Sequence, residues 1–377
     1  MAHPGIVRMS HVRRIPSSCR LRRRLPWQRR AGHSAPPELH MTPSDLPLAD
    51  VSATATLLLA LALNLALCSA SRVSALFAWP ATGAARLIRT LEARYNRPHA
   101  TEKMRRADSV SVAIVLLLAG LGFGVGLSLF LRGIPYGWIV AAAFIAMLLN
   151  LRPQLERMRI LANAVRDGSP EEARATLGLI TGRDACEEGA SGICKAAIES
   201  TAMALAQGVV GPLLWYLVGD LPGLFAFRII DTASVMIDER SENARSFGWA
   251  PRCLDAILLY PAVAIAALFA RLAAVLVPGA RLRASPVLAL RGARYAWPVF
   301  SAVIAAFADG LAVRLGGPVC VGAFHREGDS FGPSRDAGLA DLARARSLFL
   351  AATLLIAAGL TLSTFLFGPA QPLFSAQ

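Results

Sequence analysis

Long apolar stretches without a single charged residue constrain this chain more than any other feature. Residues 51–70, 109–131 and 348–367 contain no Asp, Glu, Lys or Arg. A helix rises about 1.5 Å per residue, so about 20 apolar residues cross the roughly 30 Å hydrocarbon core of a bilayer. Hydrophobic residues make up 55% of the whole chain. The sequence therefore predicts an all-α, polytopic integral membrane protein.

Five further apolar segments are harder to interpret. The segment 136–151 is short for one crossing, and 299–311 is an apolar helix that contains Asp309. Residues 202–217 and 221–237 are predicted to form a hairpin, either a re-entrant pair or two full crossings, because Gly and Pro separate them. Residues 254–277 contain Pro261 and Arg271, which makes a simple crossing doubtful. We expect roughly five to seven membrane helices.

Basic residues predict the orientation of the first spans. The segment 71–108 carries eight basic and three acidic residues, and such loops face the cytoplasm. The polar segment of about 152–198 then also lies in the cytoplasm, and we expect it to be helical. Ser169 is predicted to cap one helix that ends at Gly182, and Ser191 to cap the next. That second helix places Lys195 and Glu199 one turn apart on one face.

The net charge of +14 is concentrated in the N-terminal arm. Nine arginines and one acidic residue precede Met41, and the remaining chain has a net charge of +6. This distribution argues against nucleic-acid binding. Residues 1–50 are treated as a basic extension of the membrane domain 51–377. The arm is either an Arg-rich targeting segment or the result of a start assigned upstream of Met41. Dense positive charge on both sides of the first span favours the second alternative.

Two common kinds of site are disfavoured. The six cysteines form no Cys-x-x-Cys pair, and Cys186 and Cys194 have no histidine near them in the sequence, so a zinc site is not expected. Only two lysines are present, and no Walker A loop occurs.

A compact set of charged residues lies next to the predicted hairpin, and the motifs in and around it resemble a known family. The chain contains, in order, Ile180-Thr-Gly-Arg-Asp184, Ala196-Ala-Ile-Glu-Ser200, Gly208-Val-Val-Gly-Pro-Leu-Leu-Trp215 and Val313-Arg-Leu-Gly-Gly-Pro318. These elements and their spacing are similar to those of the CobD/CbiB family, membrane-associated proteins of cobalamin biosynthesis. The similarity extends from about residue 57 to the C-terminus.

The resemblance implies an enzyme of the bacterial cytoplasmic membrane that attaches aminopropanol, or its phosphate, to adenosylcobyric acid through an amide bond. The corrinoid is then the substrate, ATP and Mg²⁺ are implied, and other enzymes of the pathway are possible partners. Positions that match the family pattern suggest catalytic roles for Arg183, Asp184 and Glu199. Phosphate or substrate binding is suggested for the following residues: Ser200, Arg314, Gly316 and Gly317. Without the resemblance, Arg183 and Asp184 would be read as a surface ion pair, and the Gly-Gly-Pro element as a turn leaving a membrane helix.

Several departures from the family pattern leave a second hypothesis open. Where the family has Glu-Asn and Asp-Gly after Glu-Ser, this chain has Met203-Ala204 and Gln207-Gly208. Asp231 replaces a family Asn, and Glu242 keeps the register of a family Glu, so these two are candidate Mg²⁺ ligands. The acidic residues around Glu242 are equally explained as a solvated loop. The chain is thus either an active family member or a catalytically reduced scaffold that binds a corrinoid or a pathway enzyme. A small-molecule transporter is a third possibility, but the chain has no internal repeat to support it.

Overall fold

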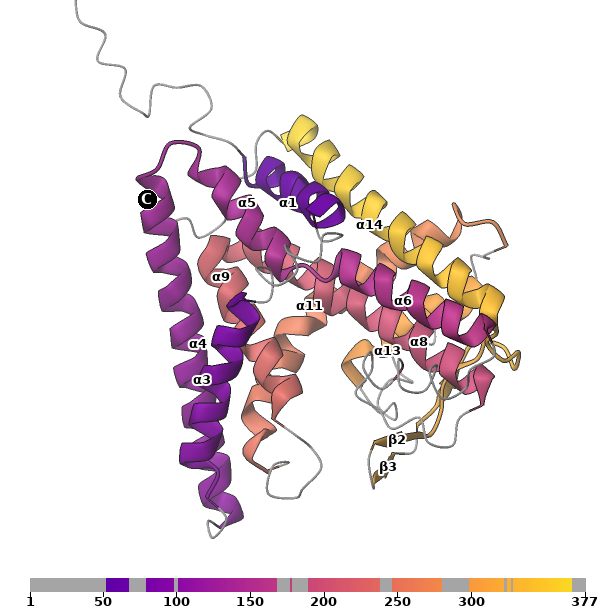
Figure 1. The fold of residues 1–377 in the computed structure, drawn as a ribbon, viewed down its shortest axis with the longest axis horizontal. Coiled ribbons are helices and arrows are strands. Elements are labelled where there is room, and N and C mark those ends of the chain that lie inside the picture. Colours follow the sequence, from indigo (N-terminus) through magenta and orange to yellow (C-terminus); the bar gives the residue numbers. More distant parts are fainter. Residues whose placement is uncertain are drawn as a thin grey trace, which may run out of the picture. The chain divides into compact units, whose positions relative to one another are not determined.

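The computed structural model describes residues 52–67, 79–97, 101–167, 177, 189–237, 246–279, 298–321, 324–326 and 328–367. All of them belong to the unit Leu46–Gln377. The elements in this part of the chain are mostly helical (Figure 1). The helices are α1 Ala53–Leu67, α3 Trp79–Tyr95, α4 Glu102–Arg132, α5 Gly137–Leu148, α6 Leu151–Arg166, α8 Ala190–Leu205, the π-helix η2 Ala206–Val210, α9 Gly211–Met236, α11 Trp249–Ala274, the 3-10 helix η4 Pro298–Phe300, α13 Ser301–Leu311 and α14 Leu339–Phe367. The strands are β1 Leu315–Gly316, β2 Val319–Val321, β3 Phe324–Arg326 and β4 Ser330–Phe331.

The predicted class, an all-α polytopic membrane protein, is confirmed. Within the described ranges, five helical stretches are long and apolar enough to cross a membrane. They are Glu102–Arg132, Gly137–Arg166, Ala190–Met236, Trp249–Ala274 and Leu339–Leu366. Two shorter apolar helices, Ala53–Ala66 and Pro298–Leu311, pack with them. The five long stretches and the two shorter helices together fall within the expected range of five to seven membrane helices.

Several helices are longer than the apolar stretches that predicted them. Helix α4 begins at Glu102, where the Thr101 hydroxyl caps it by accepting a hydrogen bond from the Met104 N–H. Helix α14 likewise begins with two polar turns before its apolar part. The segment 254–277, for which a simple crossing was doubtful, lies largely in α11, one continuous helix that includes Pro261 and is long and apolar enough to cross a membrane. Membrane helices accommodate an internal proline when neighbouring helices and local adjustments satisfy the released backbone group.

The predicted hairpin is present, and its turn lies within α9. The helical geometry breaks at Gly219 and Asp220, and Asp220 has a φ of 53°, a conformation that non-glycine residues rarely adopt. The Asp220 carboxylate accepts a hydrogen bond of 3.2 Å from the Ser128 hydroxyl of α4. The chain folds back after this break, since a Cβ on Gly211 would touch the Phe227 ring.

Helix α4 packs against this hairpin through two glycines. A Cβ on Gly120 would lie 2.8 Å from the Ala226 Cα, and one on Gly124 would lie 2.4 Å from the Pro222 Cα. Because real Cβ atoms do not approach backbone so closely, both positions require glycine for this helix contact. A small-residue face thus brings the hairpin against the longest described helix.

Two local predictions differ from the structure. Helix α8 begins after Gly189, so Ser191 lies inside its first turn and is not the cap. The small strands were not predicted: β1 pairs with β4, and β2 with β3, both antiparallel. The helix expected between Ser169 and Gly182 and the N-terminal arm lie outside the described residues, apart from Leu177.

Candidate functional site

The turn that follows α13 is joined to α8 by a buried hydrogen bond. The Gly316 N–H donates to Glu199 Oε1 at 2.7 Å, and the Glu199 side chain has no exposed surface. Gly316 and Gly317 have φ values of 80° and 88°, which glycine adopts without the steric penalty that a Cβ brings. The structure therefore brings Glu199 together with Gly316 and Gly317, which follow it by more than one hundred residues in the sequence.

The expected anion site at the glycine N–H groups is not available in this arrangement. The Gly316 N–H is taken by Glu199, and the Gly317 N–H donates to the Asp329 carbonyl at 3.0 Å. Both glycines instead build the turn, and the buried carboxylate holds it in place. Ser200 follows Glu199 on α8 and is half-buried.

Lys195 lies beside this turn. A Cβ on Gly317 would be 3.6 Å from the Lys195 Nζ, so the ammonium group stands over the backbone of the turn. Lys195 is half-buried and forms no ion pair with any other residue that the structure describes. From the sequence, Lys195 was expected to lie one helical turn from Glu199, but no functional role was predicted for it. We call Lys195, Glu199, Gly316 and Gly317 the turn cluster.

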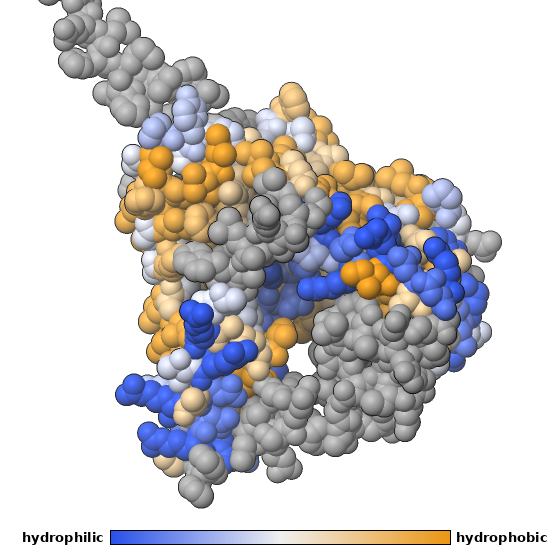
Figure 2. Space-filling view, in the orientation of Figure 1, coloured by the Kyte–Doolittle hydropathy of each residue, from blue (hydrophilic) through white to orange (hydrophobic). Residues whose placement is uncertain are grey.

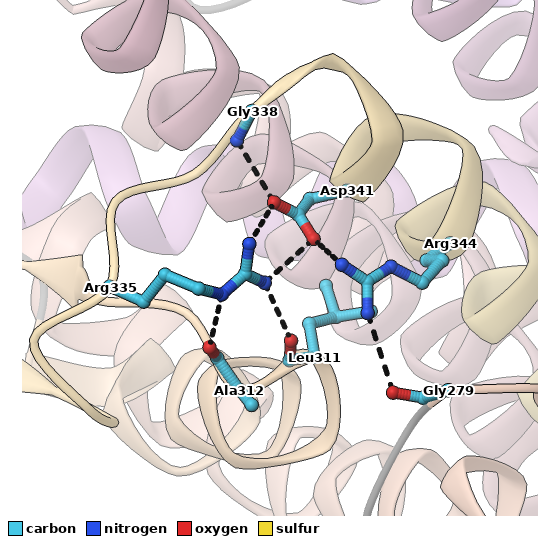
Figure 3. Close-up of polar contacts among 7 residues, drawn as sticks. All are labelled: Gly279, Leu311, Ala312, Arg335, Gly338, Asp341 and Arg344. Carbon is cyan, nitrogen blue, oxygen red and sulfur yellow. Dashed lines mark hydrogen bonds and ion pairs between the residues drawn. The ribbon is translucent and has the colours of Figure 1, made fainter.

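An ion cluster around the buried Asp341 anchors the chain on either side of the turn cluster (Figure 3). Asp341 of α14 is 1% exposed and is paired with Arg335 at 2.8 Å and with Arg344. Arg335 also donates to the Leu311 and Ala312 carbonyls at the end of α13. The hydrogen bond with Asp341 raises the pKa of Arg335 above its ordinary value. Its charge is therefore retained wherever the protein is folded.

Asp341 could have been found from the sequence as a capping residue. It accepts a hydrogen bond of 2.9 Å from the Gly338 N–H, which precedes the first turn of α14. An acidic residue at the third helical position commonly reaches back to the first backbone N–H in this way. Arg344 follows Asp341 by three residues on the same helix, a spacing at which side chains meet, so this pair could also have been predicted. The Arg335 partner could not, because its position depends on the meeting of α13 and α14.

Arg314 lies close to the turn but at the surface. Its guanidinium pairs with Asp336 at 2.6 Å, and the two side chains are 50% and 62% exposed. Its backbone N–H donates to the Arg335 carbonyl at 2.7 Å. Exposed ion pairs contribute little to stability because water and salt screen them. The Arg314 side chain is therefore accessible but already engaged.

A second polar group lies within the helix bundle. Arg228 of α9 donates to Asp231 Oδ2 at 2.8 Å and to the Leu148 carbonyl at 2.6 Å, where α5 ends. Gln207 of η2 donates to the other Asp231 oxygen, Oδ1. The π-helical turn at Ala206–Val210 thus places Gln207 against the second arm of the hairpin. We call Gln207, Arg228 and Asp231 the intramembrane cluster.

The described residues around Asp231 do not form the set of ligands that binding of Mg²⁺ would need. Both Asp231 oxygens accept hydrogen bonds, and the nearest acid in the same network is Asp255, whose Oδ2 accepts from the Ser234 hydroxyl at 2.8 Å. Among the described residues, no group of three or more His, Cys, Asp or Glu side chains is arranged to hold a metal ion. Glu242, the second expected ligand, lies outside the described residues, as do Arg183 and Asp184.

Comparisons with known proteins agree with the family resemblance. A family model described as CobD/Cbib protein matches residues 57–349. A Brucella suis protein named cobalamin biosynthesis protein CobD is 35% identical over 243 residues, covering 62% of this chain and 72% of that protein. Proteins of the same name from Rhodobacter capsulatus and Brucella anthropi are 32% and 30% identical over 288 and 295 residues. These alignments cover 75% and 74% of this chain, and 87% and 86% of those proteins. No solved structure matches.

Proposed function

Because the chain belongs to the CobD/Cbib protein family, we propose that it acts in cobalamin biosynthesis as a multi-pass enzyme of the bacterial cytoplasmic membrane. The proposed reaction joins aminopropanol, or its phosphate, to a carboxylate of adenosylcobyric acid. The amine nitrogen forms the new C–N bond and loses a proton. One carboxylate oxygen departs with the group that activated it, which the family resemblance suggests comes from ATP.

The reactants set the demands on the site. A corrinoid carboxylate, ATP and an aminopropanol phosphate are all anionic, so a site that gathers them needs cationic side chains to offset their repulsion. Mg²⁺ commonly serves the same purpose through carboxylate ligands. The described residues contain no such ligand set. Mg²⁺ and ATP are therefore supported here by the family resemblance alone.

The observation that carries the proposal is the position of Lys195 over the turn of Gly317. The other described charges around this turn have partners: Arg314 pairs with Asp336, and Arg335 and Arg344 pair with Asp341. The Lys195 ammonium is thus the cation that a phosphate or carboxylate can approach without breaking an ion pair seen in the structure. We assign Lys195 to substrate binding and the fully buried Glu199 to positioning the turn.

Arg183 and Asp184 keep their proposed catalytic roles on sequence grounds. Four residues separate Asp184 from Gly189, the N-cap of α8, and Lys195 lies in the second turn of that helix. The proposal therefore places an arginine for an anionic oxygen and a carboxylate for the amine proton on the segment leading to the turn cluster.

Growth complementation tests the proposed function. In a bacterial strain that lacks its own family member, the wild-type chain should restore growth that depends on added cobyric acid. Arg183→Ala and Asp184→Asn should not restore it, although both accumulate in the membrane to the wild-type level. Rescue by both variants would show that the catalytic residues lie elsewhere. If the wild-type chain is well expressed but does not restore growth, the hypothesis that it is an enzyme is rejected.

One observation favours the reduced scaffold as the second candidate. Met203 and Ala204, which stand where the family has Glu-Asn, belong to the packed helix core, and Ala204 is 7% exposed. A different departure preserves a contact within the bundle. Gln207 and Asp231 exchange an amide and an acid relative to the family pattern, and the structure shows them hydrogen-bonded to each other. Corrinoid binding without amide formation by purified protein would identify the scaffold.

A further inference from the structure

Charge is distributed very unevenly along α4 and the helix that precedes it. The described residues between Trp79 and Asp108 include seven basic and three acidic side chains, a net charge of +4. At the opposite end of α4 the connection to α5 contains only Gly133, Ile134, Pro135 and Tyr136 after Arg132. The basic end is also the one that the positive-inside rule assigns to the cytoplasm.

Six of the seven basic side chains at this end are exposed. The exposed ones are Arg86, Arg89, Arg94, Arg97, Lys103 and Arg106, which we call the basic patch. Figure 2 shows hydrophilic residues gathered where the ends of α3 and α4 meet, with apolar residues along the rest of α4. Arg106 pairs with Glu102 at 2.7 Å, so part of its charge is compensated. The other five basic side chains still outnumber the acidic ones.

The basic patch lies directly beside the apolar surface that faces lipid. With 31 residues, α4 is about 46 Å long, which exceeds the roughly 30 Å hydrocarbon core. Ile88 of α3 packs in one cluster with Val112 and Leu116 of α4. The exposed Arg86 and Arg89 on either side of Ile88 are therefore level with the first turns of the long apolar stretch of α4.

One face of α4 carries both kinds of surface in sequence. Lys103, Val110 and Ile114 follow at spacings of seven and four residues, which are close to whole helical turns, and all three are exposed. A cation followed by an apolar strip complements an anionic headgroup followed by an acyl chain.

We propose that the ends of α3 and α4 form a binding site for anionic phospholipids, with the phosphate at the basic patch and an acyl chain along the exposed face of α4. Clusters of four to eight basic residues at the cytoplasmic end of a membrane helix attract anionic lipid in this way. The site is separate from the turn cluster and does not depend on the proposed reaction. Its ligand class is a lipid that carries a net negative charge, such as phosphatidylglycerol.

The test compares two lipids on the purified full-length protein in detergent. Binding of phosphatidylglycerol and of phosphatidylcholine with the same acyl chains is measured for the wild type and for the combined variant Arg86→Gln, Arg89→Gln and Lys103→Gln. The matched control is Arg159→Gln, Arg166→Gln and Arg346→Gln, three exposed basic residues of α6 and α14. Melting temperatures of all three proteins are measured alongside.

The wild type should bind phosphatidylglycerol at least tenfold more tightly than phosphatidylcholine. Each removed basic side chain should weaken phosphatidylglycerol binding by roughly fivefold, while phosphatidylcholine binding and the melting temperature change little. The control should keep the preference. An equal loss in the control, or an unchanged preference in the patch variant, would overturn the proposal. Displacement of the lipid by 10 mM inorganic phosphate at constant ionic strength would also overturn it, because the site would then recognise a free phosphate.

Discussion

The turn cluster and the intramembrane cluster each contain a buried carboxylate, but the hydrogen-bond donors to these two carboxylates are of different kinds. In the intramembrane cluster, Arg228 and Gln207 occupy both oxygens of Asp231, and Arg228 also reaches the end of α5. In the turn cluster, Glu199 accepts from a backbone N–H, and the neighbouring cation, Lys195, pairs with no other described residue. A cluster whose charges are matched holds helices together, whereas an unmatched cation at a bundle end can receive a ligand. We therefore place binding chemistry at the turn.

The largest expected effect breaks the ion pair of the intramembrane cluster. Arg228→Met should destabilise the folded protein by roughly 3–5 kcal/mol, because Asp231 stays buried without its cation. The measurement is the midpoint of unfolding in detergent. The double variant Arg228→Met with Asp231→Leu should recover much of the loss, since it buries no unpaired charge. A single variant as stable as the wild type would contradict the structural role of this pair.

A smaller effect is expected when the acceptor in the turn cluster is removed. Glu199→Ala leaves the buried Gly316 N–H without its partner and should cost about 1–3 kcal/mol. Glu199→Gln keeps an oxygen acceptor and should cost less. The stability of the two variants is measured by thermal unfolding and by the rate of proteolysis at the turn. If the Gln variant were the less stable of the two, the hydrogen bond would not be what holds the turn.

The two glycines of the turn should differ from each other. Both require positive φ, so an alanine at either position carries a strain of roughly 1–2 kcal/mol. A Cβ at position 316 would also lie 2.6 Å from the Asp329 carbonyl, whereas at 317 its nearest neighbour is Lys195 Nζ at 3.6 Å. Gly316→Ala should therefore be clearly more destabilising than Gly317→Ala in the same unfolding assay. Equal losses would contradict the close packing at Gly316.

The smallest effect concerns the exposed pair beside the turn. Arg314→Gln removes an ion pair whose two side chains are at least half exposed, so the change in stability should stay below about 1 kcal/mol. The same unfolding assay at low and high salt checks this, because a screened surface pair loses what little it contributes as salt rises. A loss as large as that of Glu199→Ala would show that Arg314 is part of the buried framework.

The two clusters also differ in how far the sequence revealed them. Glu199, Gly316 and Gly317 were singled out by motif, and the structure brings them together, but their hydrogen bond removes the anion site expected at the glycines. The Gln207–Arg228–Asp231 network was not predicted. Arg228 and Asp231 are three residues apart on α9, a spacing at which side chains meet, whereas the contact with Gln207 depends on how the two helix arms lie side by side. The apolar stretches predicted the helices well, since periodicity and length suffice for a membrane span. Pairings between helices depend on side-chain positions that only the fold supplies.

The proposed role of the turn cluster in substrate binding can be measured directly. The direct measurement is the rate of amide formation by purified protein in lipid nanodiscs, compared between wild type, Lys195→Gln and Asp231→Asn, each normalised to folded protein. Lys195→Gln should keep the wild-type melting temperature and lower kcat/KM by roughly 10- to 100-fold, in keeping with a lost charged contact of about 1.5–3 kcal/mol. Asp231→Asn should lower the melting temperature and leave kcat/KM nearly unchanged. A full-rate Lys195→Gln enzyme, together with a stable but inactive Asp231→Asn protein, would contradict the account and move the site into the bundle.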